Sequence, residues 1–193
     1  MTTGDHAEHA TPTTDAGDLR VWLATVEAAM RGERDAPVPC GTCTACCRSA
    51  QFVLIEPDET DTIAHIPAEL RFPAPRRPKG HYVLGYDEHG CCPMLGDDGC
   101  RIYEHRPRTC RTYDCRVFTA TGVDPGDHQP LLAERVRRWR FRRGADGPEA
   151  VALRAAAADL AAGRAGDVPR TPLELAVRAV ELHRSYLSGP AQS

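Results

Sequence analysis

The chain has 193 residues, a net charge of −3 at neutral pH and nine cysteines, and 27 of its apolar residues are alanine. This length suits one ordinary domain, but its core is short of bulky side chains, which each contribute roughly 1.5–3 kcal/mol when buried. The balanced charge gives no reason to expect nucleic acid or an anionic membrane as a partner. No segment approaches the roughly 20 apolar residues that span a bilayer.

The N-terminal residues 1–17 are predicted to be a disordered polar tail, followed by a single domain over residues 18–193. The tail has no basic region followed by an apolar run, so it does not resemble a secretory signal. His6 and His9 within it are interpreted as solvated residues rather than ligands. We therefore expect a cytoplasmic protein, in which reducing conditions disfavour disulfides. An odd number of cysteines also fits a disulfide framework poorly.

A first helix is predicted over residues 18–31, ended by Gly32. One helical face carries its larger apolar residues, Leu19, Trp22, Leu23, Val26 and Met30. The run that follows contains prolines, which are incompatible with a helix, so the chain is expected to be extended up to Cys40.

The central region, residues 40–115, contains all nine cysteines and only short apolar runs. Two of these runs predict short strands, at residues 52–55 and 82–84, the second followed by a turn at residues 87–90. Between them, residues 67–80 are rich in proline and are expected to form an irregular loop.

The C-terminal part, residues 129–188, is predicted to be helical. Three helices are expected, at residues 130–143, 148–162 and 171–187. Thr171 and Glu174 have the spacing of a capping box at the start of the third. The predicted fold class is therefore α+β and mainly helical. Its irregular Cys-rich centre would be cross-linked by metal, with two short strands, one N-terminal helix and three C-terminal helices.

The cysteines form two groups along the chain. The first is the run Cys40, Cys43, Cys46 and Cys47, in which two small residues separate each of the first three cysteines. That spacing lets two sulfurs of one tight turn face a single metal. Adjacent cysteines project in different directions, so we expect Cys46 and Cys47 to serve different metals unless one of them bridges.

The second group has longer spacings and consists of Cys91, Cys92, Cys100, Cys110 and Cys115. Buried cysteines that act as small hydrophobes are the alternative to metal ligation. For Cys91 the two interpretations stay equally open, because Cys92 already occupies the position before Pro93. The predicted metal ligands are the other eight cysteines: Cys40, Cys43, Cys46, Cys47, Cys92, Cys100, Cys110 and Cys115.

The cysteine motifs, with the residues around them, resemble those of a known protein family. The run Cys40-x2-Cys43-x2-Cys46-Cys47, then Cys92-Pro93-x-Leu95, then Cys100-x-Ile102-Tyr103-x2-Arg106-Pro107-x2-Cys110-Arg111 resembles the YkgJ-type cysteine-cluster family (CxxCxxCC), also described as a zinc- or iron-chelating domain. The resemblance covers residues 40–115 and implies a metal or iron–sulfur protein without an assigned reaction. Cys91 and Cys115 go beyond the minimal pattern of that family.

Arg106 and Arg111 lie beside the predicted ligands. Clustered thiolates carry excess negative charge, so these two arginines are predicted to offset it or to donate hydrogen bonds to sulfur. The alternative is that they form ordinary ion pairs with Glu104 or Asp114.

The metal itself is left open between zinc and an iron–sulfur cluster, because four thiolates suit both. The double CxxC spacing is shared with ferredoxin-like runs, and with the resemblance it places iron–sulfur slightly ahead.

Catalysis has little support in the sequence. No Gly-rich phosphate loop, HExxH or Gly-x-Ser-x-Gly motif is present. Four histidines lie within the cysteine region and are interpreted as turn or neighbouring residues rather than ligands: His65, His81, His89 and His105. The resembled family includes larger flagellin lysine N-methylases with an iron–sulfur centre, so a redox or methyl-transfer enzyme is an alternative to a binding, assembly or structural protein.

A nucleic-acid-binding module is a further alternative, because six of the nine residues at 135–143 are arginine. The chain has 23 arginines and one lysine, Lys79, so an arginine-rich stretch carries little weight here. We predict a metal as partner and no membrane, and the sequence names no protein partner.

Overall fold

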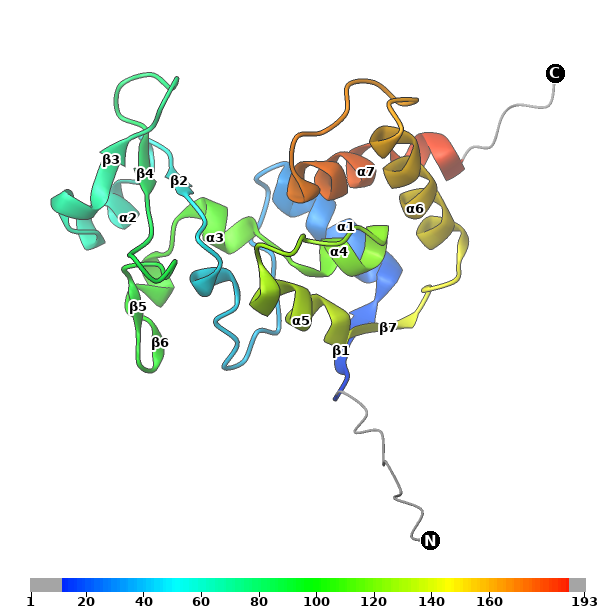
Figure 1. The fold of residues 1–193 in the computed structure, drawn as a ribbon, viewed down its shortest axis with the longest axis horizontal. Helices are drawn as coiled ribbons and strands as arrows, with labels where there is room; N and C mark the ends of the chain where they lie inside the picture. Colours follow the sequence, from blue (N-terminus) through cyan, green and yellow to red (C-terminus); the bar gives the residue numbers. More distant parts are fainter. Residues whose placement is uncertain (1–11, 188–193) are drawn as a thin grey trace, which may run out of the picture.

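The structure is a computed structural model that describes residues 12–187. It has two lobes joined where several cysteine-bearing segments meet (Figure 1). The helical lobe contains α1 (Leu19–Met30), α4 (Arg116–Thr121), α5 (Pro130–Arg138), α6 (Pro148–Ala161) and α7 (Pro172–Leu187), with strands β1 (Thr14–Asp18) and β7 (Trp139–Arg143).

The smaller lobe contains only short elements. Its strands are β2 (Val53–Ile55), β3 (Arg71–Pro73), β4 (Tyr82–Leu84), β5 (Leu95–Gly96) and β6 (Gly99–Cys100). Its helices are α2 (Thr60–His65) and α3 (Arg108–Thr112), with 3-10 turns η1 (Cys46–Arg48), η2 (Ala68–Leu70) and η3 (Tyr103–His105). The mixed, mainly helical α+β class is thus confirmed, although the expectation of only two strands is wrong.

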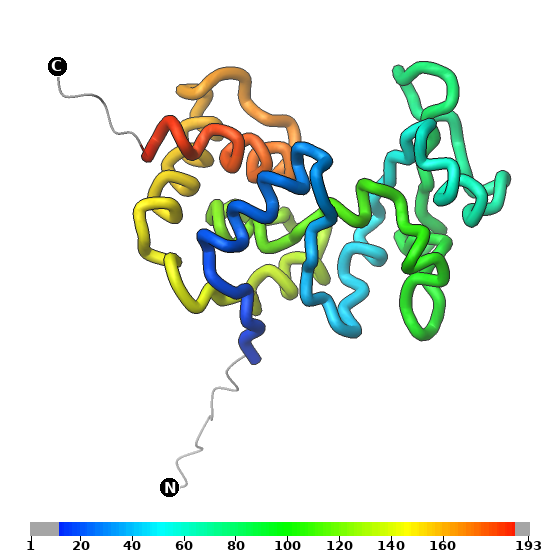
Figure 2. Tube along the Cα trace, turned by 180° about the vertical axis from the view of Figure 1, so that it is seen from behind, coloured from blue at the N-terminus to red at the C-terminus, as the bar shows by residue number. Residues whose placement is uncertain are grey.

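The first helix agrees with the sequence prediction. The Asp18 side chain caps α1 by accepting hydrogen bonds from the backbone N–H groups of Arg20 (2.9 Å) and Val21 (3.4 Å). Gly32 follows the helix in the left-handed region, at φ 75°, where glycine is favoured. The apolar stripe of α1 is buried, and the helix packs across α6 and α7 and reaches α3 (Figure 2).

The last two helices also agree with prediction, and they pack against each other through alanine. Ala156 on α6 and Ala179 on α7 are both fully buried, and their small side chains allow a close approach of the two helices. At the start of α7, the Thr171 hydroxyl accepts from the Glu174 N–H at 3.1 Å. The Glu174 carboxylate reaches back to the N–H of Arg170 at 2.8 Å, which completes the expected cap one residue earlier than predicted.

The helix predicted over residues 130–143 is only half correct. It ends at Arg138, and residues 139–143 form β7, which pairs in parallel with β1. The physical reason is that apolar and charged side chains alternate here with the two-residue period of a strand. Trp139 is fully buried and Phe141 packs on Trp22, whereas the arginines between and after them face solvent. The predicted disordered tail is wrong over residues 14–17, which belong to β1, while residues 1–11, with His6 and His9, lie outside the described residues.

The smaller lobe is built on a three-stranded antiparallel sheet in the order β2-β4-β3. β2 and β4 were predicted, but β3 lies in the stretch expected to be an irregular loop, where Arg71–Pro73 pairs with Tyr82–Leu84. Proline fits at this edge strand because its missing N–H is not needed there. This lobe has its own apolar cluster around Ile55, Ile66 and Leu84, separate from the cluster of the helical lobe. That residues 18–193 fold as a single domain stays a prediction.

Within the described range, no helix has the length and apolar character needed to cross a membrane.

Candidate metal centre

The first cysteine run forms a tight turn between the lobes. The N–H of Cys43 donates to the carbonyl of Cys40 at 3.0 Å, and Gly41 lies in the left-handed region at φ 56°. The chain then enters η1, which starts at Cys46. The carbonyl of Cys47 accepts from the N–H of Cys92 at 2.7 Å, which joins the first run to the second group of cysteines.

Four cysteines gather on the side of the helical lobe. Burial raises the pKa of Cys46 well above its ordinary value, and the neighbouring sulfurs, Cys115 foremost and then Cys40, raise it further. Burial likewise raises the pKa of Cys115 to about 12, with Cys40 and Cys43 among its neighbours. Cys40 is exposed at the surface, yet the atoms around it remove enough water to raise its pKa as well. We call Cys40, Cys43, Cys46 and Cys115 the first cysteine set.

Four others gather on the side of the smaller lobe. Burial, with the nearby sulfurs of Cys92 and Cys100, raises the pKa of Cys47 to about 11. The pKa of Cys110 is raised to about 12 by burial, followed by Cys92, Cys47 and Cys100. We call Cys47, Cys92, Cys100 and Cys110 the second cysteine set. Adjacent Cys46 and Cys47 therefore face different sets.

The two sets are neighbours, since Cys40 and Cys43 also act on Cys47, though more weakly than its own set. All nine cysteines are free thiols. Among the described residues, no three cysteine sulfurs come within 4.8 Å of one another. The donor chemistry nevertheless fits a metal, because each set offers four thiols at one place.

Cys91 stands apart from both sets. Its sulfur accepts from Arg48 Nη1 at 3.7 Å and lies 3.9 Å from the carbonyl of His89. It lines an open pocket of ≈ 590 Å³ together with Arg48, Asp87 and Arg101. This position tests neither of the two interpretations that the sequence left open for Cys91.

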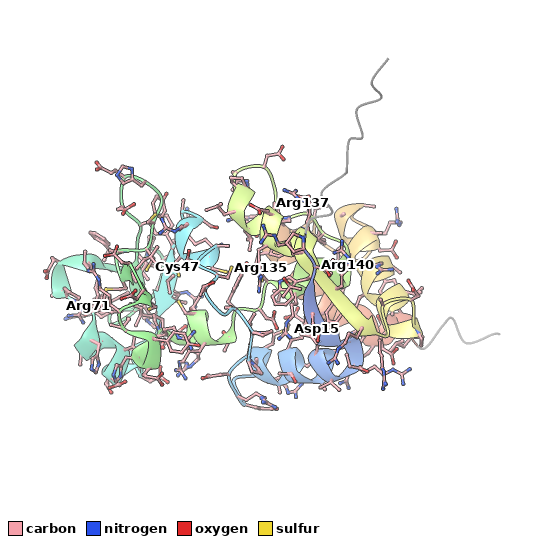
Figure 3. The ribbon with its side chains drawn as sticks, turned by 90° about the horizontal axis from the view of Figure 1, so that it is seen from below. Asp15, Cys47, Arg71, Arg135, Arg137 and Arg140 are labelled. Carbon is pink, nitrogen blue, oxygen red and sulfur yellow. The ribbon has the colours of Figure 1, made fainter. Side chains whose placement is uncertain are left out.

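Trp139 gives the first set a hydrogen-bond donor that the sequence did not reveal. Its indole N–H donates to the sulfur of Cys115 at 3.2 Å, and both residues are buried. The guanidinium of Arg135 lies 4.2 Å from the centre of the Trp139 ring, and its charge partly opposes the rise in the pKa of Cys40 that burial causes. Figure 3 shows Arg135 and Cys47 at the junction of the two lobes.

Tyr113 is buried against the same set. Burial, together with the sulfurs of Cys46 and Cys115, raises the pKa of its hydroxyl well above the usual range. Gln51 is near enough to affect this pKa, but the Tyr113 hydroxyl makes no regular hydrogen bond within the described chain. A buried donor without a regular partner therefore lies beside thiols that would be anionic if they held a metal.

A buried ionic network positions Cys115. The carboxylate of Asp114 accepts from the Trp22 indole N–H at 2.8 Å and from Arg116 Nη2 at 2.7 Å. Arg116 also donates to the carbonyl of Ala16 at 3.2 Å. Cys115 lies between these two charged residues in the chain and directly before α4, so its backbone is fixed from both sides.

The two arginines predicted to support the metal ligands differ from each other. The guanidinium of Arg106 covers the Tyr103 ring at 3.6 Å, and its charge partly opposes the rise in the pKa of Cys110 that burial causes. Arg111 instead contacts the carboxylates of Asp35, at 3.0 Å, and Glu59, at 4.0 Å. Supporting the second cysteine set thus remains a prediction for Arg106, while the carboxylate contacts of Arg111 correspond to the ion-pair alternative, with different partners from those expected.

The four histidines of this region contact carboxylates. His81 lies 3.0 Å from Glu56 and His89 lies 3.5 Å from Glu88. His65 and His105 both lie close to Asp61, outside the two cysteine sets. No sequence motif predicts this arrangement.

The fold thus brings cysteines from both groups of the sequence together at the junction of the lobes, as a thiolate metal site would require. Residues 39–129 match the family model CxxCxxCC, described as "Putative zinc- or iron-chelating domain". This confirms the resemblance drawn from the motifs: residues 39–129 are similar to this zinc- or iron-chelating domain family. Comparison with curated proteins gave no match, and neither did comparison with solved structures.

Proposed function

We propose that the protein binds two metal centres, one in each four-cysteine set. The observation that carries this proposal is the division of Cys46 and Cys47 between the two sets. Eight cysteines would then act as ligands, and Cys91 would remain a free thiol.

The surroundings of each set support ligation. Four thiolates around one zinc dication leave a net charge of about −2, which the protein must compensate. Near the first set, Trp139 donates to a sulfur and Arg135 supplies positive charge. Near the second set, Arg106 has the same electrostatic effect on Cys110.

Of the two candidate metals, we propose an iron–sulfur cluster. A single zinc ion holds each sulfur at about 2.3 Å, so every pair of its sulfur ligands must lie within about 4.6 Å. Among the described residues, no three cysteine sulfurs all lie within 4.8 Å of one another. A cluster spaces its cysteine ligands further apart, because several irons lie between them. Donors to sulfur, such as the indole of Trp139, are also a means of setting a reduction potential.

The proposed biological role is binding or structural, in a reducing cytoplasmic setting that nine free thiols suit. A redox or methyl-transfer enzyme stays the alternative if the cluster cycles between oxidation states. The nucleic-acid alternative loses part of its basis, because the arginine-rich segment is not one continuous helix. Three of its arginines are also engaged within the chain: Arg135 on Trp139, Arg138 with Glu134, and Arg142 with Asp15.

The test is anaerobic purification, followed by a visible spectrum and analysis of iron, zinc and acid-labile sulfide on one sample. We expect a brown protein with iron and sulfide. A colourless protein with zinc would retain the two-site proposal and overturn the choice of metal. A folded protein without either would overturn both.

Matched variants test the division of the sets. Cys46→Ser and Cys47→Ser are each expected to lose about half of the bound metal. The double variant should lose most of it, and Cys91→Ser should lose none. If the two single variants removed the same metal, so that the double variant lost no more than either, the two-set assignment would be wrong.

A further inference from the structure

Three side chains of the smaller lobe meet at its surface, outside both cysteine sets: Asp61, His65 and His105. One ligand atom from each lies within 4.8 Å of the others. Asp61 and His65 are four residues apart on α2, so they project from the same helical face. His105 comes from η3, at the end of the segment that follows Cys100.

The contacts between these groups are close. His105 Nδ1 lies 2.7 Å from Asp61 Oδ2, and His65 Nδ1 lies 3.6 Å from Asp61 Oδ1. The two imidazole rings are stacked, with centroids 3.5 Å apart and planes at 4°. The Nδ1 atoms of both histidines therefore already lie beside the Asp61 carboxylate.

We propose that Asp61, His65 and His105 form a separate site for one divalent transition-metal ion, bound through two imidazoles and one carboxylate. Two nitrogens and an oxygen are a donor set suited to zinc, nickel, copper and iron(II), unlike the all-sulfur sets. The side chains keep substantial exposure, 70% for Asp61, 42% for His65 and 38% for His105. The remaining coordination positions are therefore open to water or to an incoming ligand.

The site also joins two elements that the second cysteine set depends on. α2 already contacts the segment of Cys110, because Thr62 Oγ1 donates to the carbonyl of Arg106 at 3.4 Å. The Glu59 carboxylate, just before α2, accepts from the N–H of Arg108 at the start of α3. A metal held between α2 and η3 would add a third connection at this place and restrain the backbone that carries Cys110.

The experiment uses the full chain with its cysteine sets filled, in a His6→Ala/His9→Ala background that removes two histidines of the tail. Ni²⁺ is titrated by calorimetry, and the ring protons of the remaining histidines are followed by NMR. We expect about one equivalent of micromolar binding, with selective paramagnetic broadening of the His65 and His105 signals. His65→Ala and His105→Ala should each weaken binding at least tenfold, and Asp61→Asn somewhat less.

His89→Ala is the matched control, because His89 is also an exposed histidine beside a carboxylate but has no second imidazole. It should bind Ni²⁺ like the background chain. Binding weaker than millimolar, equal broadening of all histidines, or unchanged affinity in His65→Ala and His105→Ala would each overturn the proposal. The NMR result on the unsubstituted site stands even if a variant fails to fold.

Discussion

Replacing Asp114 by alanine should cause one of the largest single losses of stability in this chain. The Asp114 side chain is 1% exposed and that of its partner Arg116 is 9% exposed. Asp114→Ala removes the contact to Arg116 Nη2 at 2.7 Å and those to its Nε at 3.0 and 3.1 Å, and it leaves the Trp22 indole N–H without its acceptor.

The magnitude follows from the burial of the cation that is left behind. Breaking a buried ion pair by removing one partner costs about 3–5 kcal/mol, and an unsatisfied buried donor costs about 1–3 kcal/mol. These contributions share one network and do not simply add, so we expect a loss of at least about 3 kcal/mol. Against a typical total stability of about 5–15 kcal/mol, that is a large fraction.

The assay is urea unfolding of the metal-loaded protein, followed by far-UV circular dichroism and by metal release. Asp58→Ala is the control, since Asp58 forms an exposed ion pair with Arg108 and should change stability little. Asp114→Ala/Arg116→Met should recover part of the loss, because no buried cation remains. A loss below about 1 kcal/mol for Asp114→Ala, which is the value of a surface pair, would refute the reasoning, as would a double variant less stable than the single one.

Four further predictions concern the surroundings of the sulfurs, the protons of the cysteine thiols and the core. With an iron–sulfur cluster in the first set, Tyr113→Phe should lower the reduction potential measured by voltammetry, because a hydrogen-bond donor near sulfur is lost. An unchanged potential would contradict this prediction. Tyr103→Phe is the control, because Tyr103 is exposed. Because the pKa of Cys47 is about 11 and that of Cys110 about 12, both thiols are protonated at pH 7. Zn²⁺ binding there should release both protons, as calorimetry in buffers of different ionisation enthalpy would detect. Both pKa values are raised on folding, so the stability of the metal-free protein should fall as the pH rises from about 9 to about 12, and a flat profile would count against these shifts. Fully buried Leu153→Ala should cost about 2–5 kcal/mol in urea unfolding, whereas a loss near zero would mean that the core repacks freely.

Much of the fold could be predicted where the signal is local. α1 and α7 begin at capping side chains, α1 and α6 are followed by Gly32 and Gly163, and each of the three helices formed close to its expected bounds. β7 could not be predicted in this way, because its partner β1 lies far away in the sequence. Its many arginines also make the alternation of buried and exposed side chains hard to recognise. The pairing of Arg71–Pro73 with β4 failed for the same reason: proline content suggested a loop, and only the tertiary partner makes it a strand.

The same distinction between local and long-range features holds for the candidate site. The CxxC spacing of the first run, together with the family resemblance of the later motifs, pointed to the eight cysteines, because such motifs are local in sequence. It could not divide them into sets, since Cys115 joins Cys46 only through the fold. The donor Trp139 and the meeting of His105 with Asp61 likewise depend on long-range packing.

The pairing of β1 with β7 has a consequence for the chain during its synthesis. Thr14 leaves the ribosome early, but its partner Trp139 follows only after the whole cysteine region has been made. Domains form as their sequence emerges, at about 5–20 residues per second. Before Trp139 is made, each thiol therefore spends about 1 to 20 seconds on the nascent chain, shortest for Cys115 and longest for Cys40. Metal delivery in that interval would precede the strand pairing that closes the helical lobe.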